Sequence, residues 1–199
     1  SVHVLTHPDD PADDYDILTR KVTSQLEQFA PCHLVAESFS GPLGIRIAYE
    51  HPHLVERLTL VATFATSPAP AMARIVPWSL IFRLPMPGIV ASIFLTGSDP
   101  PLANRLRQAV RQISPATLAK RLRCVLNVDV RSHLCSLACP IQYLRATHDR
   151  LVRARSVREI QQANPRVAVV EIEGPHLILQ ANPRACWDAI MNWATKVDA

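Results

Sequence analysis

Ser38 is the residue whose surroundings most favour nucleophilic chemistry. It follows the apolar residues 34–36 and precedes a predicted helix, within the sequence AESFS at residues 36–40. A serine lifted out of a strand on a sharp turn has a strained backbone, so the residues two before and two after it must be small. Ser40 fits less well, because Pro42 would then occupy a position that must be small. The pattern also suits a serine that only caps a helix.

This stretch resembles the nucleophile turn of the α/β-hydrolase superfamily, with alanine and serine in place of the usual glycines. Members of that superfamily carry a serine, an acid and a histidine in this order along the chain. Residues 147–152, THDRLV, resemble the acid turn of the family and make Asp149 the acid. Residues 173–176, EGPH, resemble its histidine loop and make His176 the general base.

The resemblance implies a role for each of these residues. Ser38 attacks the substrate carbonyl, and His176 takes the serine proton and returns one to the leaving alcohol. Asp149 holds the imidazole in the useful tautomer. The backbone N–H of Phe39, at the start of a helix, is placed to donate to the oxyanion. Glu37 is assigned no chemistry.

An alternation of strands and helices would position these residues. Short apolar runs predict strands at residues 2–6, 33–36, 58–62, 141–146 and 167–172. Helical periodicity and helix-start signals predict helices at 14–29, 39–50, 156–163 and 183–196. This order predicts an α/β fold with a mostly parallel sheet and flanking helices. The resemblance implies that this is a compact α/β-hydrolase fold with a shortened N-terminal part.

Residues 67–137 interrupt the alternation. The segment contains many prolines, has a helical pattern and is rich in large apolar residues between 81 and 95. We therefore expect a hydrolase core formed by residues 1–66 and 138–199, with 67–137 inserted as a helical lid. The apolar residues would line an acyl pocket, form a dimer contact or pack on the core.

The N-terminal part allows two interpretations. In one, residues 2–6 form the strand that precedes the elbow strand in sequence, and the strand that normally carries the second oxyanion donor is absent. In the other, residues 2–6 lie beside the elbow strand, and residues 6–8 supply that donor. Either sheet is short and has an exposed edge strand, so we expect a second subunit, in a homodimer, or an exchanged lid segment to cover the edge.

Composition excludes several other classes of protein. The chain has 199 residues and a net charge of +4, and its one dense basic stretch, 105–123, has the spacing of a solvated helix face rather than a nucleic-acid site. Five cysteines form neither a disulfide framework nor a complete metal site. Prolines break the apolar region 77–95, so we expect no membrane span, and with no signal peptide visible a cytoplasmic location.

These observations predict a serine-dependent carboxylic ester hydrolase without a cofactor or metal. Its small-molecule substrate would be a short to medium acyl ester, because nothing charged in the insertion demands an ionic substrate. Two alternatives stay open. One is an acyltransferase or perhydrolase-type relative that uses the same three residues, and the other is a catalytically weak binding module with the hydrolase fold.

Overall fold

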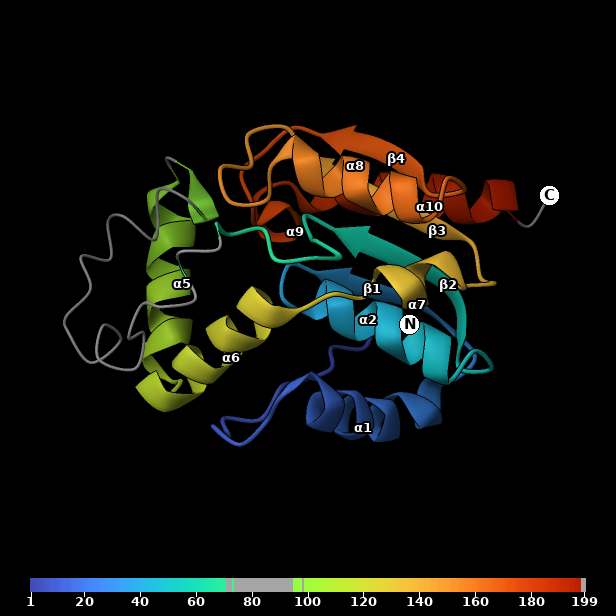
Figure 1. Cartoon of the computed structure of the whole chain (residues 1–199). Coiled ribbons are helices and arrows are strands. Elements are labelled where there is room, and N and C mark those ends of the chain that lie inside the picture. Colours follow the sequence, from blue (N-terminus) through green and yellow to red (C-terminus); the bar gives the residue numbers. More distant parts are fainter. Residues whose placement is uncertain (71–72, 74–94, 98, 198–199) are drawn as a thin grey trace.

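The computed structural model describes residues 1–70, 73, 95–97 and 99–197 (Figure 1). Its centre is one parallel sheet with the strand order β1-β2-β3-β4. The strands are β1 (Cys32–Glu37), β2 (Val55–Val61), β3 (Ile141–Ala146) and β4 (Ala168–Ile172). The predicted α/β class with a parallel sheet is therefore confirmed. The apolar residues 81–94 of the predicted lid lie outside the described residues.

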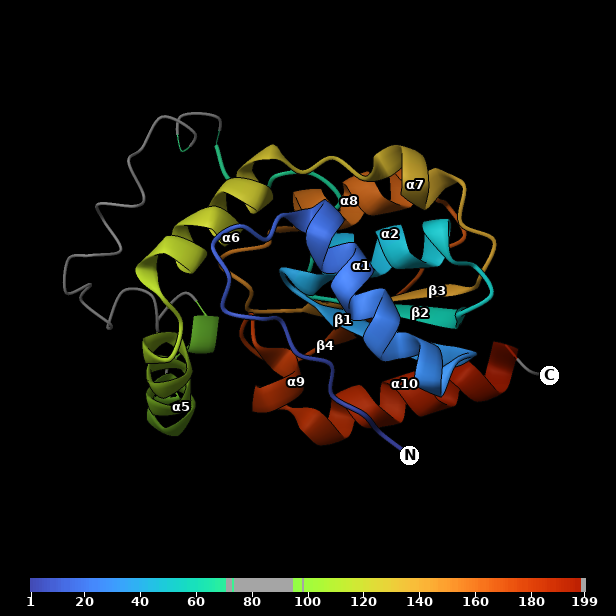
Figure 2. The ribbon, with the colours of Figure 1, turned by 90° about the horizontal axis from the view of Figure 1, so that it is seen from below.

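Helices cover both faces of this sheet. The described helices are α1 (Tyr15–Leu26), the short 3₁₀ helix η1 (Glu27–Phe29), α2 (Ser40–Glu50), α5 (Pro100–Arg111), α6 (Pro115–Asn127), α7 (Arg131–Cys135), α8 (Ala154–Ala163), α9 (Ile178–Ala181) and α10 (Pro183–Val197). Helices α2, α7 and α8 lie on one face, and α9 and α10 lie on the other (Figures 1 and 2). Helix α1 lies beside α2 at the β1 end of the sheet. None of the described helices is long and apolar enough to cross a membrane.

The parallel direction of the strands determines where the candidate site lies. Because all four strands are parallel, their carboxyl ends lie at the same edge of the sheet. Helices α5 and α6 lie beyond this edge (Figure 1). Leu58, Leu60 and Leu144 are fully buried in the middle of the sheet, as expected for parallel strands that are covered on both faces.

Residues 2–6 do not form the predicted strand. Residues 1–12, all of which are described, contain no strand, and Val2 and Val4 are 70% and 86% exposed. The backbone of Thr6 instead bonds to the side chain of Gln25 on α1, at N–O distances of 3.3 and 3.2 Å. Neither interpretation of this segment as a strand is correct, because no strand forms there and the backbone of Thr6 pairs with a helix rather than with β1.

Strand β1 consequently lies at an edge of the described sheet. Val35, in the middle of the strand, is 38% exposed, although a parallel strand is normally buried on both faces. The side chains of Leu34 and Ala36, which point the other way, pack closely against Gly44 of α2. One face of β1 is therefore packed and the other is partly open.

Candidate active site

The candidate nucleophile lies on a strained turn between β1 and α2. Ser38 has a φ of 51°, in the left-handed region that residues other than glycine rarely adopt. Its N–H donates to the carbonyl oxygen of Val61 at 2.9 Å, and its own carbonyl oxygen accepts from the N–H of Gly41 at 3.0 Å. These bonds hold the turn between the end of β2 and the first turn of α2.

A buried threonine, Thr63, holds this turn through its side-chain hydroxyl. The Thr63 hydroxyl donates to the carbonyl oxygen of Ser38 at 2.5 Å. The hydroxyl of Tyr143 on β3 donates to the Thr63 carbonyl at 2.8 Å and accepts from the Thr63 N–H at 3.0 Å. Thr63 approaches α2 so closely that a Cβ on Gly41 would lie 1.9 Å from its hydroxyl oxygen. Glycine is therefore required at position 41, three residues after Ser38.

His176 follows β4 and lies directly against Ser38. Its side chain is fully buried, and its Nε2 lies 2.7 Å from the Ser38 hydroxyl oxygen. Its Nδ1 lies 2.7 Å from Oδ2 of Asp149. A carboxylate can only accept, so Nδ1 carries the proton and Nε2 is free to accept from the serine hydroxyl. This tautomer is the one that a general base requires.

Asp149 follows β3 on a tight turn that fixes its carboxylate. Its side chain is 3% exposed, and its Oδ1 accepts from the N–H groups of Leu151 and Val152, both at 2.8 Å. Oδ2 is left to accept from His176. Both oxygens of the buried carboxylate are therefore bonded, as a buried charge requires.

The structure brings together the three side chains that the sequence singles out. Ser38, Asp149 and His176 follow β1, β3 and β4, whose carboxyl ends share one edge of the sheet. Ser40 lies elsewhere, with its hydroxyl 2.9 Å from Nε2 of His7. Nδ1 of His7 is buried without a hydrogen-bond partner among the described residues, so this second serine–histidine pair has no carboxylate behind it.

Phe39 lies at the start of α2, with its backbone N–H next to the nucleophile. Within the part of the chain that the structure describes, this N–H makes no hydrogen bond. The Phe39 ring stacks on Tyr15 at a centroid distance of 5.0 Å, and the Tyr15 hydroxyl donates to the Phe39 carbonyl at 3.0 Å. The residue is thus held by α1, and its N–H stays available to a ligand at Ser38.

Glu37 is a site residue that the sequence analysis missed. Its Oε1 accepts from the N–H of Leu179 at 3.3 Å, and its Oε2 accepts from the side-chain amide of Gln180 at 2.8 Å. Burial raises the pKa of this carboxyl, while the two hydrogen bonds and the nearby His176 oppose the rise. The contact joins residues more than 140 positions apart, and no local pattern of the sequence indicates it.

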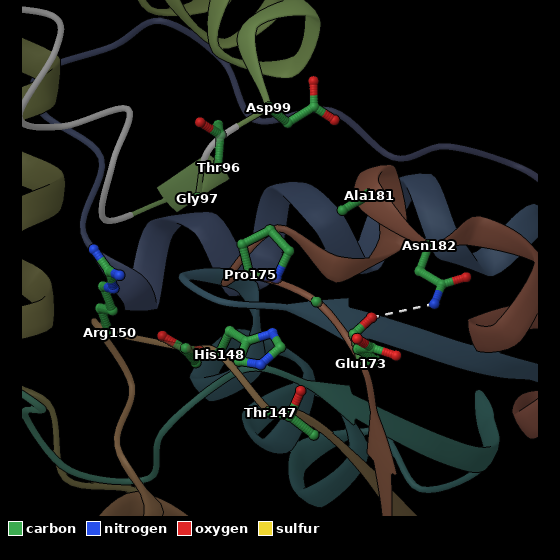
Figure 3. Close-up of a pocket in the computed structure, with 12 residues that line it drawn as sticks. Thr96, Gly97, Asp99, Thr147, His148, Arg150, Glu173, Pro175, Ala181 and Asn182 are labelled. Atoms are coloured by element: carbon green, nitrogen blue, oxygen red, sulfur yellow. Dashed lines mark hydrogen bonds between the residues drawn. The ribbon is translucent and has the colours of Figure 1, made fainter.

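A cavity of about 770 Å³ lies beside the acid turn and the histidine loop (Figure 3). Its lining combines residues from the acid turn, the histidine loop and the segment that enters α5, among them His148, Pro175 and Asp99. The Asn182 side chain donates to the Glu173 carbonyl at 3.1 Å at its border. No group of three or more His, Cys, Asp or Glu side chains among the described residues could hold a metal ion.

Comparisons with known proteins identify similar sequences and similar structures. No family model matches the sequence. Pyrrolizixenacetamide deacetylase of Xenorhabdus hominickii is 22% identical over 170 residues, which cover 80% of this chain and 64% of the relative. The chain thus spans just under two thirds of the length of the curated relatives it matches.

Solved structures agree with the chain over most of its length. The enol-lactonase from Burkholderia xenovorans superposes with a TM-score of 0.81 at 20% identity, covering 94% of this chain and 75% of that structure. A thermophilic esterase from Thermogutta terrifontis superposes with a TM-score of 0.75 at 20% identity, covering 94% and 74%. At this level of identity the likeness concerns the fold.

Proposed function

This chain has the α/β-hydrolase fold, and on that premise we propose that it is a serine hydrolase that cleaves carboxylic esters of short to medium acyl chains. The observation that carries the proposal is the hydrogen-bonded series from Ser38 through His176 to Asp149, with 2.7 Å at each step. The strained φ of Ser38 supports it further, because strain of this kind is retained at functional sites.

The reaction follows from the geometry. The Ser38 oxygen attacks the ester carbonyl carbon while its proton moves to Nε2 of His176. The resulting oxyanion accepts from the Phe39 N–H. When the intermediate collapses, the carbon–oxygen bond to the alcohol breaks, Nε2 returns the proton to the leaving oxygen, and the acyl group stays on Ser38. A water molecule then attacks the acyl-enzyme, again with His176 as base, and releases the carboxylic acid.

The Phe39 N–H is the oxyanion donor that we propose. Loss of one oxyanion donor costs about 100- to 1,000-fold in rate in other hydrolases. We therefore expect a slow esterase if Phe39 acts alone. Acyl transfer would proceed through the same acyl-enzyme, with an alcohol, an amine or a peroxide in place of water.

We propose that residues 67–137 form the lid. Helices α5 and α6, which belong to this segment, lie beyond the strand ends that carry Ser38, Asp149 and His176 (Figure 1). Leu95, which precedes α5 in this segment, accepts a hydrogen bond from the N–H of Leu177, next to His176, at 3.0 Å. A closed lid would hold the acyl chain over the serine and exclude water.

A second copy of this chain is the partner that we propose for the edge of β1. Two edge strands related by a two-fold axis pair antiparallel, and each then satisfies the free N–H and C=O groups of the other. The partly exposed Val35 would be covered in this pair. Sedimentation over a hundredfold range of concentration tests this, and a monomer throughout that range would contradict it.

The function is tested with p-nitrophenyl acetate, butyrate and octanoate, using the wild type and Ser38→Ala. We expect hydrolysis that the substitution abolishes, and the preferred chain length would measure the acyl pocket. Activity that survives in Ser38→Ala would exclude Ser38 as the nucleophile. A folded wild type that hydrolyses none of the esters, and that a fluorophosphonate does not label at Ser38, would favour the binding module.

A further inference from the structure

The residue before the nucleophile connects two parts of the site that are far apart in sequence. We infer that Glu37 is a positioning residue for His176. The Glu37 carboxylate ties the elbow to α9, directly after the histidine loop, and supports the positive charge that His176 acquires during the reaction. The inference rests on the proposed function, because it assigns Glu37 a role in the work of the same base. Neither the fold nor the three-residue series requires an acidic residue at this position.

The first argument is how the histidine loop is held. On one side, the N–H of His148 donates to the Gly174 carbonyl at 3.0 Å and joins the loop to the acid turn. On the elbow side, Glu37 accepts from Leu179 and Gln180, directly after the loop. Apart from the Ser38–His176 bond, the described residues make no other hydrogen bonds between the elbow and this loop. Glu37 therefore provides, beside the Ser38–His176 bond, the link between the elbow and the residues directly after the histidine loop.

The second argument is the charge of Glu37 in its surroundings. The side chain bonds to α9, which lies with α10 on one face of the sheet (Figure 2), and burial there raises the pKa of its carboxyl. The titratable groups that act on it or respond to it there are His176 and the thiol of Cys186 on α10. The Cys186 pKa is raised to about 11 by burial and by the Glu37 charge. Burying a charged carboxylate costs free energy unless other groups, such as hydrogen-bond donors or a cation, interact with the charge.

The third argument is the chemistry of the base. His176 is neutral before the reaction and cationic at each tetrahedral intermediate. Asp149 faces the imidazole through Nδ1, and the attraction between His176 and Glu37 opposes the effect of burial on the Glu37 carboxyl. By reciprocity, a charged Glu37 stabilises the cation of His176. Glu37 would then be a second carboxylate whose charge acts on His176, while Asp149 alone accepts a hydrogen bond from the ring among the described residues.

The test is Glu37→Gln, which has the same shape without the charge. Its amide oxygen can accept from the Leu179 N–H, and the exposed Gln180 amide can turn to meet its NH₂ group. The matched control is Glu171→Gln on β4, an exposed carboxylate paired with Arg145. Three quantities are measured: thermal stability, the pH profile of kcat/KM for p-nitrophenyl butyrate, and the NMR titration of the His176 ring.

We expect Glu37→Gln to be at least as stable as the wild type, because it removes a charge that burial disfavours. Its kcat should fall about tenfold, and the acidic limb of the kcat/KM profile should move to lower pH. The NMR titration should move in the same direction. Glu171→Gln should match the wild type in all three measurements.

The outcomes separate the inference from the proposed function. NMR reports the protonation of His176 without turnover, so an inactive wild type with a shifted titration in Glu37→Gln overturns the esterase and keeps the link between Glu37 and His176. An active wild type with unchanged profile, kcat and titration in Glu37→Gln overturns the inference and keeps the esterase. If Glu37→Gln unfolds at a lower temperature than the wild type while the His176 titration is unchanged, Glu37 has only a structural role. This result overturns the inference too.

Discussion

The backbone of Ser38 makes a prediction that can be tested without a substrate. With a φ of 51°, the residue lies in the left-handed region, which costs a non-glycine residue about 1–2 kcal/mol and glycine almost nothing. Ser38→Gly and Ser38→Ala both lose the hydroxyl and its bond to His176. The two variants therefore differ mainly in how well they tolerate the conformation of the turn.

Ser38→Gly should be the more stable variant, by about 1 kcal/mol. The left-handed penalty of about 1–2 kcal/mol acts against alanine, and the greater freedom of glycine in the unfolded chain offsets about 0.5–1 kcal/mol of it. For a domain of this size, 1 kcal/mol corresponds to about 2–4 °C in Tm. Ser40, in the first turn of α2, provides the control. There the order should reverse, with alanine more stable than glycine by about 0.5–1 kcal/mol.

Urea unfolding followed by far-ultraviolet circular dichroism gives the free energy of unfolding of all four variants. The two serines are close in sequence, and each pair of variants loses the same hydroxyl contact, so the opposite order isolates the backbone. If alanine is the more stable replacement at both positions, Ser38 does not have the strained conformation, and the elbow argument is refuted.

Two further predictions concern the support of the turn and the effect of pH. Gly41→Ala should destabilise the chain by about 1–3 kcal/mol. A double-mutant cycle should show that Thr63→Gly recovers part of this loss, because the three atoms nearest to the added Cβ all belong to Thr63. Additive effects of the two substitutions would contradict the close approach. The pKa values of His7 and His33 are lowered from 6.5, mainly by burial, so the unfolded chain binds more protons and the free energy of unfolding should fall as pH drops below about 6.5. His33→Gln should weaken this dependence in urea titrations between pH 5 and 8, and an unchanged slope would count against it.

The sheet could be predicted because its signals are local. Strands expected at 33–36, 58–62, 141–146 and 167–172 occur within a few residues of these bounds, since a parallel strand buried on both faces is a short apolar run. The start of β2 was placed three residues late because Glu56 and Arg57 are charged. Parallel order then puts the ends of β1, β3 and β4 at one end of the sheet. The three residues that the resemblance to the α/β-hydrolase motifs singles out, Ser38, Asp149 and His176, could therefore be expected to lie together.

The errors came from interactions between distant parts of the chain. Residues 2–6 are apolar at alternate positions, but a strand also needs a partner, and Gln25 of α1 provides the hydrogen bonds instead. Glu37 follows the same logic, because its partners lie on α9. Helix α9 itself has only four residues and is too short for a periodic signal.

The parallel sheet also has a practical consequence for attaching this protein to a surface. The carboxyl ends of the strands carry the site, so the opposite edge lies about 20 Å away, the length of a six-residue strand. Cys135 is the exposed member of the five free cysteines, and it ends α7, just before the chain enters β3 at that opposite edge. A maleimide linker at Cys135 would therefore immobilise the chain with Ser38 and its approach facing the solution.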